Sequence, residues 1–214
     1  MVKKLTLLVL FVTLPAAYAS IIQTTATLPP TSGQYSISGT ICLPAACFQD
    51  ITIGNFQILT STISAGNQLT SSNASLTANG FTNSGGNPGA ALGTLLLTGP
   101  IDITYFGRSA LDALGTFNSQ ITFLNFTGSF AGHTAAALLN PLNASVGVTS
   151  VSQLNENQFR IDSFFDVFAE LSIDGGPFIP GPVRHADLVP EPGTFIPGLL
   201  AVAGFAAYWK RRSS

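Results

Sequence analysis

QYSISGTI, residues 34–41, is the stretch that decides the fold class. Its apolar residues, Tyr35, Ile37 and Ile41, all stand at odd positions, and small polar residues fill the even positions between them. Successive side chains of a β-strand point to opposite faces, so this alternation predicts a strand with one face buried and the other in water. An α-helix would instead repeat its apolar positions every three or four residues.

Two further stretches extend this pattern. In ITIGNFQIL (51–59) the apolar positions change phase beside Gly54, which predicts a β-bulge. ITFLNFTGSF (121–130) is apolar on both faces, which predicts an inner strand of a sandwich. Clusters of turn residues such as TSG and NSGGNPG separate these stretches. Together they predict an all-β fold, an antiparallel β-sandwich-like single domain.

Three segments carry other local signals. Residues 82–90, TNSGGNPGA, combine Gly, Asn and Pro and are expected to form a long loop. SALDALG (109–115) and HTAAALLN (133–140) are the two segments of the body in which we expect short helices.

The most charged stretch, NQFRIDSFFDVFAELSIDGG (157–176), fits two structures. As a strand it places Ile161 and Phe165 on one face and its acidic side chains on the other, before an Asp-Gly-Gly turn. As a helix it would stack Phe164 and Phe168 in one stripe opposite the acids. The aromatic and β-branched content favours the strand.

The acids of this stretch decide whether a metal site is credible. On a strand, Asp162 and Asp166 are four residues apart, about 13 Å at roughly 3.3 Å per residue. Calcium binds oxygen ligands at about 2.3–2.6 Å, so the two carboxylates could not share one ion. We therefore expect a solvated acidic face on which Arg160 pairs across strands, and no metal or cofactor.

Charge is scarce and uneven in the body of the protein. Residues 20–190 contain no lysine, three arginines and nine carboxylates, for a net charge near −6, so the sequence excludes a phosphate-binding surface and a nucleic-acid partner. Asp50 is the one charged residue from Ser20 to Ile101, which leaves little like-charge repulsion between copies. A content of 46% hydrophobic residues with 16 Phe argues against disorder.

Cys42 and Cys47, in CLPAAC, are the two cysteines of the chain. Outside the cytoplasm the default state of such a pair is a disulfide, and unpaired thiols are the alternative. Two thiols without companion ligands make a poor zinc site. We expect the disulfide.

No pattern in the sequence proposes a catalytic site. There is no Gly-x-Ser-x-Gly elbow and no Ser-x-x-Lys, and the two histidines are His133 and His185, the latter in a linker-like approach to the C-terminal segment. A secreted hydrolase would need converging carboxylates, for example Asp102 or Asp112 with Asp166. We predict that the protein is not an enzyme and keep a polysaccharide- or protein-acting hydrolase as the alternative.

The N-terminus has the pattern of a secretory signal peptide. Two lysines precede the apolar run 5–14, and Ala17, Tyr18 and Ala19 form an A-x-A cleavage site. The Sec translocon and signal peptidase are the expected partners, and Ser20 is expected to open the mature chain.

The C-terminus combines a Pro-Glu-Pro, a short apolar run and a basic tip. Residues 195–209 carry no charge and would reach about 22 Å as a helix, short of the roughly 30 Å hydrocarbon core. Lys210, Arg211 and Arg212 follow directly, and the positive-inside rule places them in the cytoplasm. We expect a thin transmembrane helix that serves as a temporary anchor.

Pro190, Glu191 and Pro192, with the apolar run and the basic stop after them, resemble the PEP-CTERM sorting signal of Gram-negative bacteria. The resemblance covers about 26 residues, and residues 157–176 also resemble a stretch that precedes the anchor in such proteins. It implies recognition by an inner-membrane exosortase, which removes the helix near the Pro-Glu-Pro. Substrates of this system commonly accompany exopolysaccharide production.

The resemblance therefore implies three parts: a signal peptide (1–19), an extracellular β-rich domain (20–187) and a sorting signal (188–214). The protein would be exported, held briefly in the inner membrane, and then placed at the cell surface or in the extracellular matrix. We expect a non-enzymatic, exopolysaccharide- or biofilm-associated protein. A module that binds ice or carbohydrate is a further alternative, since ice-binding-type proteins also carry such signals.

Overall fold

The computed structural model describes residues 20–190. The predicted signal peptide with Ala17 and Ala19 lies outside the described residues. So do Glu191 and Pro192, the predicted transmembrane helix, and the basic stop Lys210, Arg211 and Arg212. Among residues 20–190, no helix is long and apolar enough to cross a membrane.

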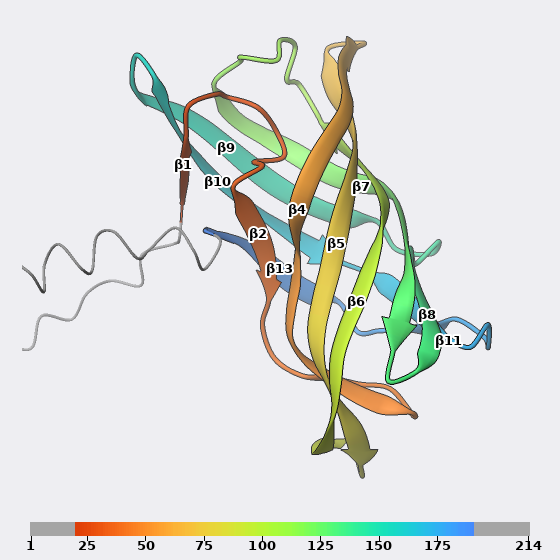
Figure 1. Ribbon diagram of the computed structural model, residues 1–214. Helices are drawn as coiled ribbons and strands as arrows, with labels where there is room; N and C mark the ends of the chain where they lie inside the picture. Colours follow the sequence, from red (N-terminus) through yellow and green to blue (C-terminus); the bar gives the residue numbers. More distant parts are fainter. Residues whose placement is uncertain (1–19, 191–214) are drawn as a thin grey trace, which may run out of the picture.

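The described chain consists of strands joined by turns and loops, and all strand pairs are antiparallel (Figure 1). The strands are β1 (Ile21–Gln23), β2 (Gly33–Ile37), β3 (Ile41–Cys42), β4 (Ala46–Ser64), β5 (Asn67–Ser84), β6 (Asn87–Tyr105), β7 (Gly115–Phe130), β8 (His133–Leu139), β9 (Ser145–Asn155), β10 (Gln158–Val167), β11 (Ala169–Ile173), β12 (Ile179–Pro180) and β13 (Arg184–Pro190). The all-β, antiparallel prediction is confirmed.

The strands form one sheet that closes on itself. β10, β13, β2, β4, β5, β6 and β7 are neighbours in that order, and β9 pairs with both β7 and β10 to complete the ring. In Figure 1 the wall formed by β2, β4, β5 and β6 lies in front of the wall formed by β7, β9 and β10. The arrangement is sandwich-like, with two walls facing each other and joined by strand pairing at both sides.

The two ends of the described chain meet beside β10. β1 pairs with residues 159–161 of β10, and β13 pairs with residues 164–167 along the same side of that strand. β13 also pairs with β2 as far as Pro190, which lies opposite Gly33. Residues 188–190 are therefore part of the sheet, and β13 is one of the strands that close it. His185 lies on this strand and not in a linker.

The predicted bulge, inner strand and charged strand are all present. The register of β4 against β5 shifts between Gly54 and Gln57, as the phase change indicated. β7 has strand neighbours on both sides, as predicted for an inner strand, but Phe123, on its other face, is 44% exposed. Residues 158–173 form β10 and β11, interrupted at Phe168. The helical alternative for this stretch is therefore wrong.

Three local predictions are wrong. Residues 82–90 form no long loop, because β5 and β6 meet at a tight turn of Gly85 and Gly86, both with positive φ, as a two-residue hairpin turn requires. Residues 133–139 form β8 instead of a helix, with two of its alanines buried. Residues 109–114 form an irregular loop instead of a helix. In the first two cases pairing with neighbouring strands outweighs the local propensity.

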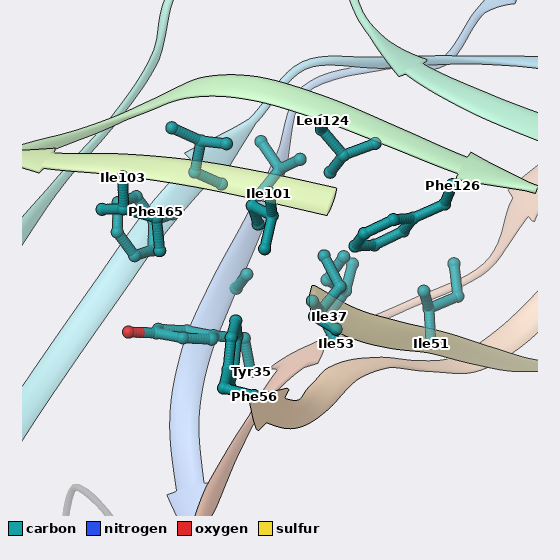
Figure 2. Close-up of a cluster of buried hydrophobic side chains, with 14 of the residues drawn as sticks. Tyr35, Ile37, Ile51, Ile53, Phe56, Ile101, Ile103, Leu124, Phe126 and Phe165 are labelled. Atoms are coloured by element: carbon teal, nitrogen blue, oxygen red, sulfur yellow. The ribbon is translucent and has the colours of Figure 1, made fainter. Parts of the chain in front are cut away.

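Apolar side chains from both walls meet in the interior (Figure 2). Tyr35 packs edge-on against Phe56 and Phe165, with ring centroids 5.8 and 5.2 Å apart. Leu97 and Phe126 are completely buried, and full burial of such a side chain stabilises the fold by about 1.5–3 kcal/mol. The core therefore holds the two walls together.

A chain of hydroxyl groups crosses part of this interior. The Tyr35 hydroxyl donates to Ser163 Oγ over 3.1 Å, and Ser163 Oγ lies 2.7 Å from Thr149 Oγ1. Burial raises the pKa of the Tyr35 phenol, so this group remains a neutral hydrogen-bond donor.

One end of the closed sheet is tied together by Arg108, which is completely buried. Its guanidinium donates to the carbonyl oxygens of Ala26 at 2.6 Å, Leu111 at 2.7 Å and Ala113 at 3.2 Å, and to the side chain of Gln68. These acceptors lie on β5 and on the β1–β2 and β6–β7 loops. Arg108 therefore joins three segments that are distant in sequence.

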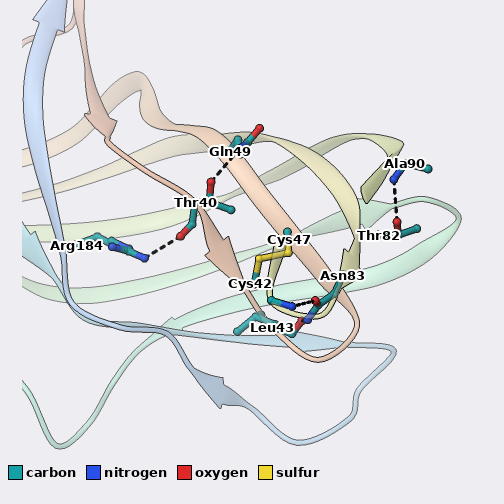
Figure 3. Close-up of a disulfide and its surroundings, with 10 residues drawn as sticks. Thr40, Cys42, Leu43, Cys47, Gln49, Thr82, Asn83, Ala90 and Arg184 are labelled. Atoms are coloured by element: carbon teal, nitrogen blue, oxygen red, sulfur yellow. Dashed lines mark hydrogen bonds between the residues drawn. A yellow bond between two sulfur atoms is a disulfide. The ribbon is translucent and has the colours of Figure 1, made fainter. Parts of the chain in front are cut away.

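The opposite end carries the expected disulfide (Figure 3). Cys42 and Cys47 are directly paired residues of β3 and β4. Leu43, in the turn between them, accepts a hydrogen bond of 2.8 Å from the Asn83 side chain of β5. The disulfide hairpin is thereby fastened to the β5–β6 hairpin.

Candidate binding site

A polar hollow of about 530 Å³ lies on the outer face of β4, β5 and β6. Its lining residues are Asn55, Gln57, Asn73, Ala74, Ser75, Leu96, Thr98 and Gly99. Most of the lining consists of amide and hydroxyl side chains, and Leu96 adds an exposed apolar surface.

The β-bulge of β4 creates this hollow. Asn55 adopts a left-handed conformation with φ of 55°, which asparagine tolerates better than most residues. Its side chain donates a hydrogen bond of 2.7 Å to Ser75 Oγ on β5, which fixes the bulge to the neighbouring strand. Gln57 and Asn73 are directly paired just beyond the bulge, and both are exposed. The bulge therefore presents a group of amides to solvent.

The hollow is electrically neutral. None of its lining residues titrates, and the chain carries no charged residue from Ile51 to Ile101. Amide and hydroxyl groups both donate and accept hydrogen bonds, which suits a ligand rich in neutral hydroxyl groups. The same lining contains no carboxylate, histidine or cysteine, so the hydroxyls of Ser75 and Thr98 have no general base beside them in the hollow.

The acidic residues singled out from the sequence lie elsewhere. Asp166 of β10 accepts a hydrogen bond of 2.8 Å from His185 Nδ1, and Asp187 lies 3.2 Å from the other ring nitrogen. Each of these side chains is about half exposed on the outer face. The hydrogen bond with Asp166 is the main cause that raises the pKa of His185. The two carboxylates bind opposite sides of one imidazole and do not converge on a shared space.

Arg160 does not pair across strands as expected. Its Nε lies 3.1 Å from Asp162 Oδ2, two positions along the same strand and on the same face. At the C-terminal end of the charged stretch 157–176, Asp174 Oδ2 lies 2.6 Å from His133 Nδ1 of β8. This hydrogen bond is the main cause that lowers the pKa of Asp174. Both contacts are exposed. The first lies along β10, and the second joins the start of β8 to the turn after β11.

The carboxylates proposed for a hydrolase are not brought together. Asp102 lies on β6, and β7 and β9 stand between β6 and β10, which carries Asp166. Asp112 lies in the irregular loop that follows β6. Within residues 20–190, no three His, Cys, Asp or Glu side chains are placed to hold a metal ion.

The sequence analysis missed Asn55, Gln57 and Asn73 as candidate binding residues. The one signal that pointed to them was the phase change at Gly54, which located the bulge but not the face on which the amides gather. That face is defined only when β4, β5 and β6 are paired, because Asn73 is 18 residues from Asn55 in the sequence.

Comparison with known proteins finds no match to a family model, to a curated protein or to a solved structure.

Proposed function

We propose that this protein is an exported, non-enzymatic cell-surface or matrix protein that binds neutral exopolysaccharide in the hollow on β4, β5 and β6. The observation that carries the proposal is the lining of the hollow, which is rich in amides and hydroxyls and contains no titratable group. Sugar hydroxyls find both donors and acceptors there, and an uncharged glycan loses no ionic solvation on binding.

Two features of the fold support export and processing. The Cys42–Cys47 disulfide suits an oxidising compartment outside the cytoplasm. β1 begins at Ile21, directly after the predicted signal-peptidase site, and β13 includes Pro190, the first residue of the Pro-Glu-Pro. Because β13 pairs with both β2 and β10, we propose that the exosortase-type cleavage falls after Pro190 and leaves the closed sheet whole.

The binding proposal is tested with the full-length chain on a panel of immobilised neutral glucans, galactans and mannans. The double substitution Gln57→Ala and Asn73→Ala removes two amides, each worth about 0.5–1.5 kcal/mol as a hydrogen-bonding group, so we expect at least about fivefold weaker binding. Gln153→Ala, at an exposed amide on β9, is the matched control and should leave the affinity unchanged. Equal binding by the double variant and the wild type would contradict this site.

The sorting proposal is tested by mass spectrometry of the protein released by a Gram-negative host with an exosortase. We expect an N-terminus at Ser20 and a C-terminus at Pro190. Glu191→Ala should retain the C-terminal segment and keep the protein in the membrane fraction. A released wild-type protein with an intact C-terminus would refute the processing, without bearing on glycan binding.

A further inference from the structure

An apolar pocket of about 90 Å³ lies inside the closed sheet, at the end that carries the disulfide. Its walls come from both sides of the sheet and include Phe48, Ile51, Leu124, Ala137 and Leu171. Along β5 the pocket lies about ten residues, or roughly 33 Å, from the end that Arg108 ties together. It is therefore separate from both the Arg108 cluster and the outer polar hollow.

Two charged side chains contribute to the walls of this pocket, Glu170 of β11 and Arg184 of β13. Arg184 donates a hydrogen bond of 2.8 Å from one terminal nitrogen to the carbonyl oxygen of Thr40 (Figure 3). Its Nε is buried and has no hydrogen-bond partner among residues 20–190. Arg184 also forms no ion pair within this described part of the chain.

The Arg184 side chain as a whole is only half-buried, but its buried Nε–H has lost water and gained no hydrogen bond in return, which is costly. Arg184 bears this cost beside a pocket whose other walls are almost entirely apolar. A ligand with one anionic oxygen group and an apolar remainder would satisfy both features. A carboxylate fits especially well, since Nε and the neighbouring terminal nitrogen of an arginine can donate to its two oxygens together.

We propose that this pocket binds a short aliphatic carboxylate, with the alkyl chain inside the pocket and the carboxylate on the guanidinium of Arg184. The volume sets the size of the chain. A dry cavity of about 150 Å³ accommodates the six carbons of benzene, so a pocket of about 90 Å³ encloses about three or four carbons of an alkyl chain, and a longer chain extends toward its open side. Glu170 is only half-buried, so water screens its repulsion of the bound anion.

The test measures binding of hexanoate, hexanol and hexylamine to the full-length chain by titration calorimetry, in a sterol-based detergent whose ring system is too large for the pocket. Methyl NMR of Ile51 and Ile53 reports whether the ligand enters the pocket. We expect saturable binding of hexanoate, at least about tenfold tighter than hexanol, because a charge-assisted hydrogen bond is worth about 1.5–3 kcal/mol.

Variants separate the two halves of the site. Arg184→Gln should weaken hexanoate binding at least tenfold and leave hexanol binding unchanged, because it removes the charge and keeps a donor for Thr40. Ala169→Leu adds bulk to the pocket wall and should abolish binding of both ligands. Arg160→Gln, at an exposed arginine on β10, is the control and should change neither.

Three results would overturn the proposal: no saturable hexanoate binding, unchanged affinity in Arg184→Gln, or hexylamine binding as tight as hexanoate. The last would assign the head group to Glu170 instead. If Arg184→Gln fails to fold, Ala169→Leu together with the comparison of the three head groups still tests the proposed site. Glycan binding involves the other face of the sheet, so its success or failure is independent of this result.

Discussion

Replacing Arg108 by methionine should destabilise the protein strongly, although the arginine has no carboxylate partner. Arg108 is completely buried and supplies hydrogen bonds to three backbone carbonyls and to Gln68. Methionine is of similar length and can occupy much of the same space, but it donates no hydrogen bond. The substitution therefore leaves four acceptors without their donor, those of Ala26 and Gln68 buried and those of Leu111 and Ala113 partly buried.

The expected size of the effect follows from those acceptors. A buried polar group left without a partner costs about 1–3 kcal/mol, so four would cost more than most domains can lose. Two terms reduce the loss: the charge no longer has to be buried, and the loops can open to admit water. The attraction between Arg108 and the Phe117 ring, 5.7 Å away, is lost as well. We expect a net loss of about 3–4 kcal/mol in the free energy of unfolding.

Urea unfolding of the full-length chain, followed by circular dichroism, measures this loss. Limited proteolysis should show new cuts in residues 24–32 and 106–114, the two loops that Arg108 joins to β5. Arg160→Met is the control, because its exposed contact with Asp162 contributes less than about 1 kcal/mol. If Arg108→Met loses no more stability than this control, or if its loops resist cleavage as in the wild type, the hydrogen bonds of Arg108 are not what holds this end of the sheet together.

Three further predictions concern single contacts. The double substitution Cys42→Ser and Cys47→Ser should lower the free energy of unfolding by about 2 kcal/mol, the value for closing so short a loop, and the same loss should appear when the wild type is unfolded with and without reductant. Gly128→Ala should lower the free energy of unfolding by about 3 kcal/mol, because the added Cβ would meet a backbone carbonyl of β6. A variant as stable as the wild type in urea unfolding would show that the two strands can move apart to make room. His185 stabilises the fold below its ordinary pKa of 6.5, and this contribution is lost as the pH rises through its raised pKa. The thermal midpoint of the wild type should therefore fall across that pH range, and His185→Gln should make the fall smaller. An unchanged pH profile in the variant would argue against the contact with Asp166.

Much of the strand content follows from local pattern. Tyr35 and Ile37 are buried and Ser36 between them is more exposed, as their alternation indicated. Where the local signal was ambiguous, the neighbours decided. The alanines of HTAAALLN favour a helix in isolation, but Ala135 and Ala137 lie buried in β8 between β7 and β11. A small side chain suits that position because it packs closely against neighbouring strands.

Such local patterns did not predict the two candidate sites. Asn55 and Asn73 share a face only because β4 and β5 pair with a shifted register at the bulge. The sequence predicts a linker-like segment around His185, yet the adjacent Arg184 begins a strand that lies between β2 and β10. The apolar pocket beside its unpartnered nitrogen is formed by elements spread across most of the described chain.

Residue type and the spacing of a few positions are enough to predict that the body is built of half-buried strands, that its two cysteines are close enough to bond, and that its surface is nearly free of cations. These properties are local. The closure of the sheet through β9 and β13, the burial of Arg108 and the apolar pocket at one end of the interior appear only in the folded chain. Those properties depend on hydrogen bonds and packing between strands far apart in the chain, for which a single sequence carries no local signal.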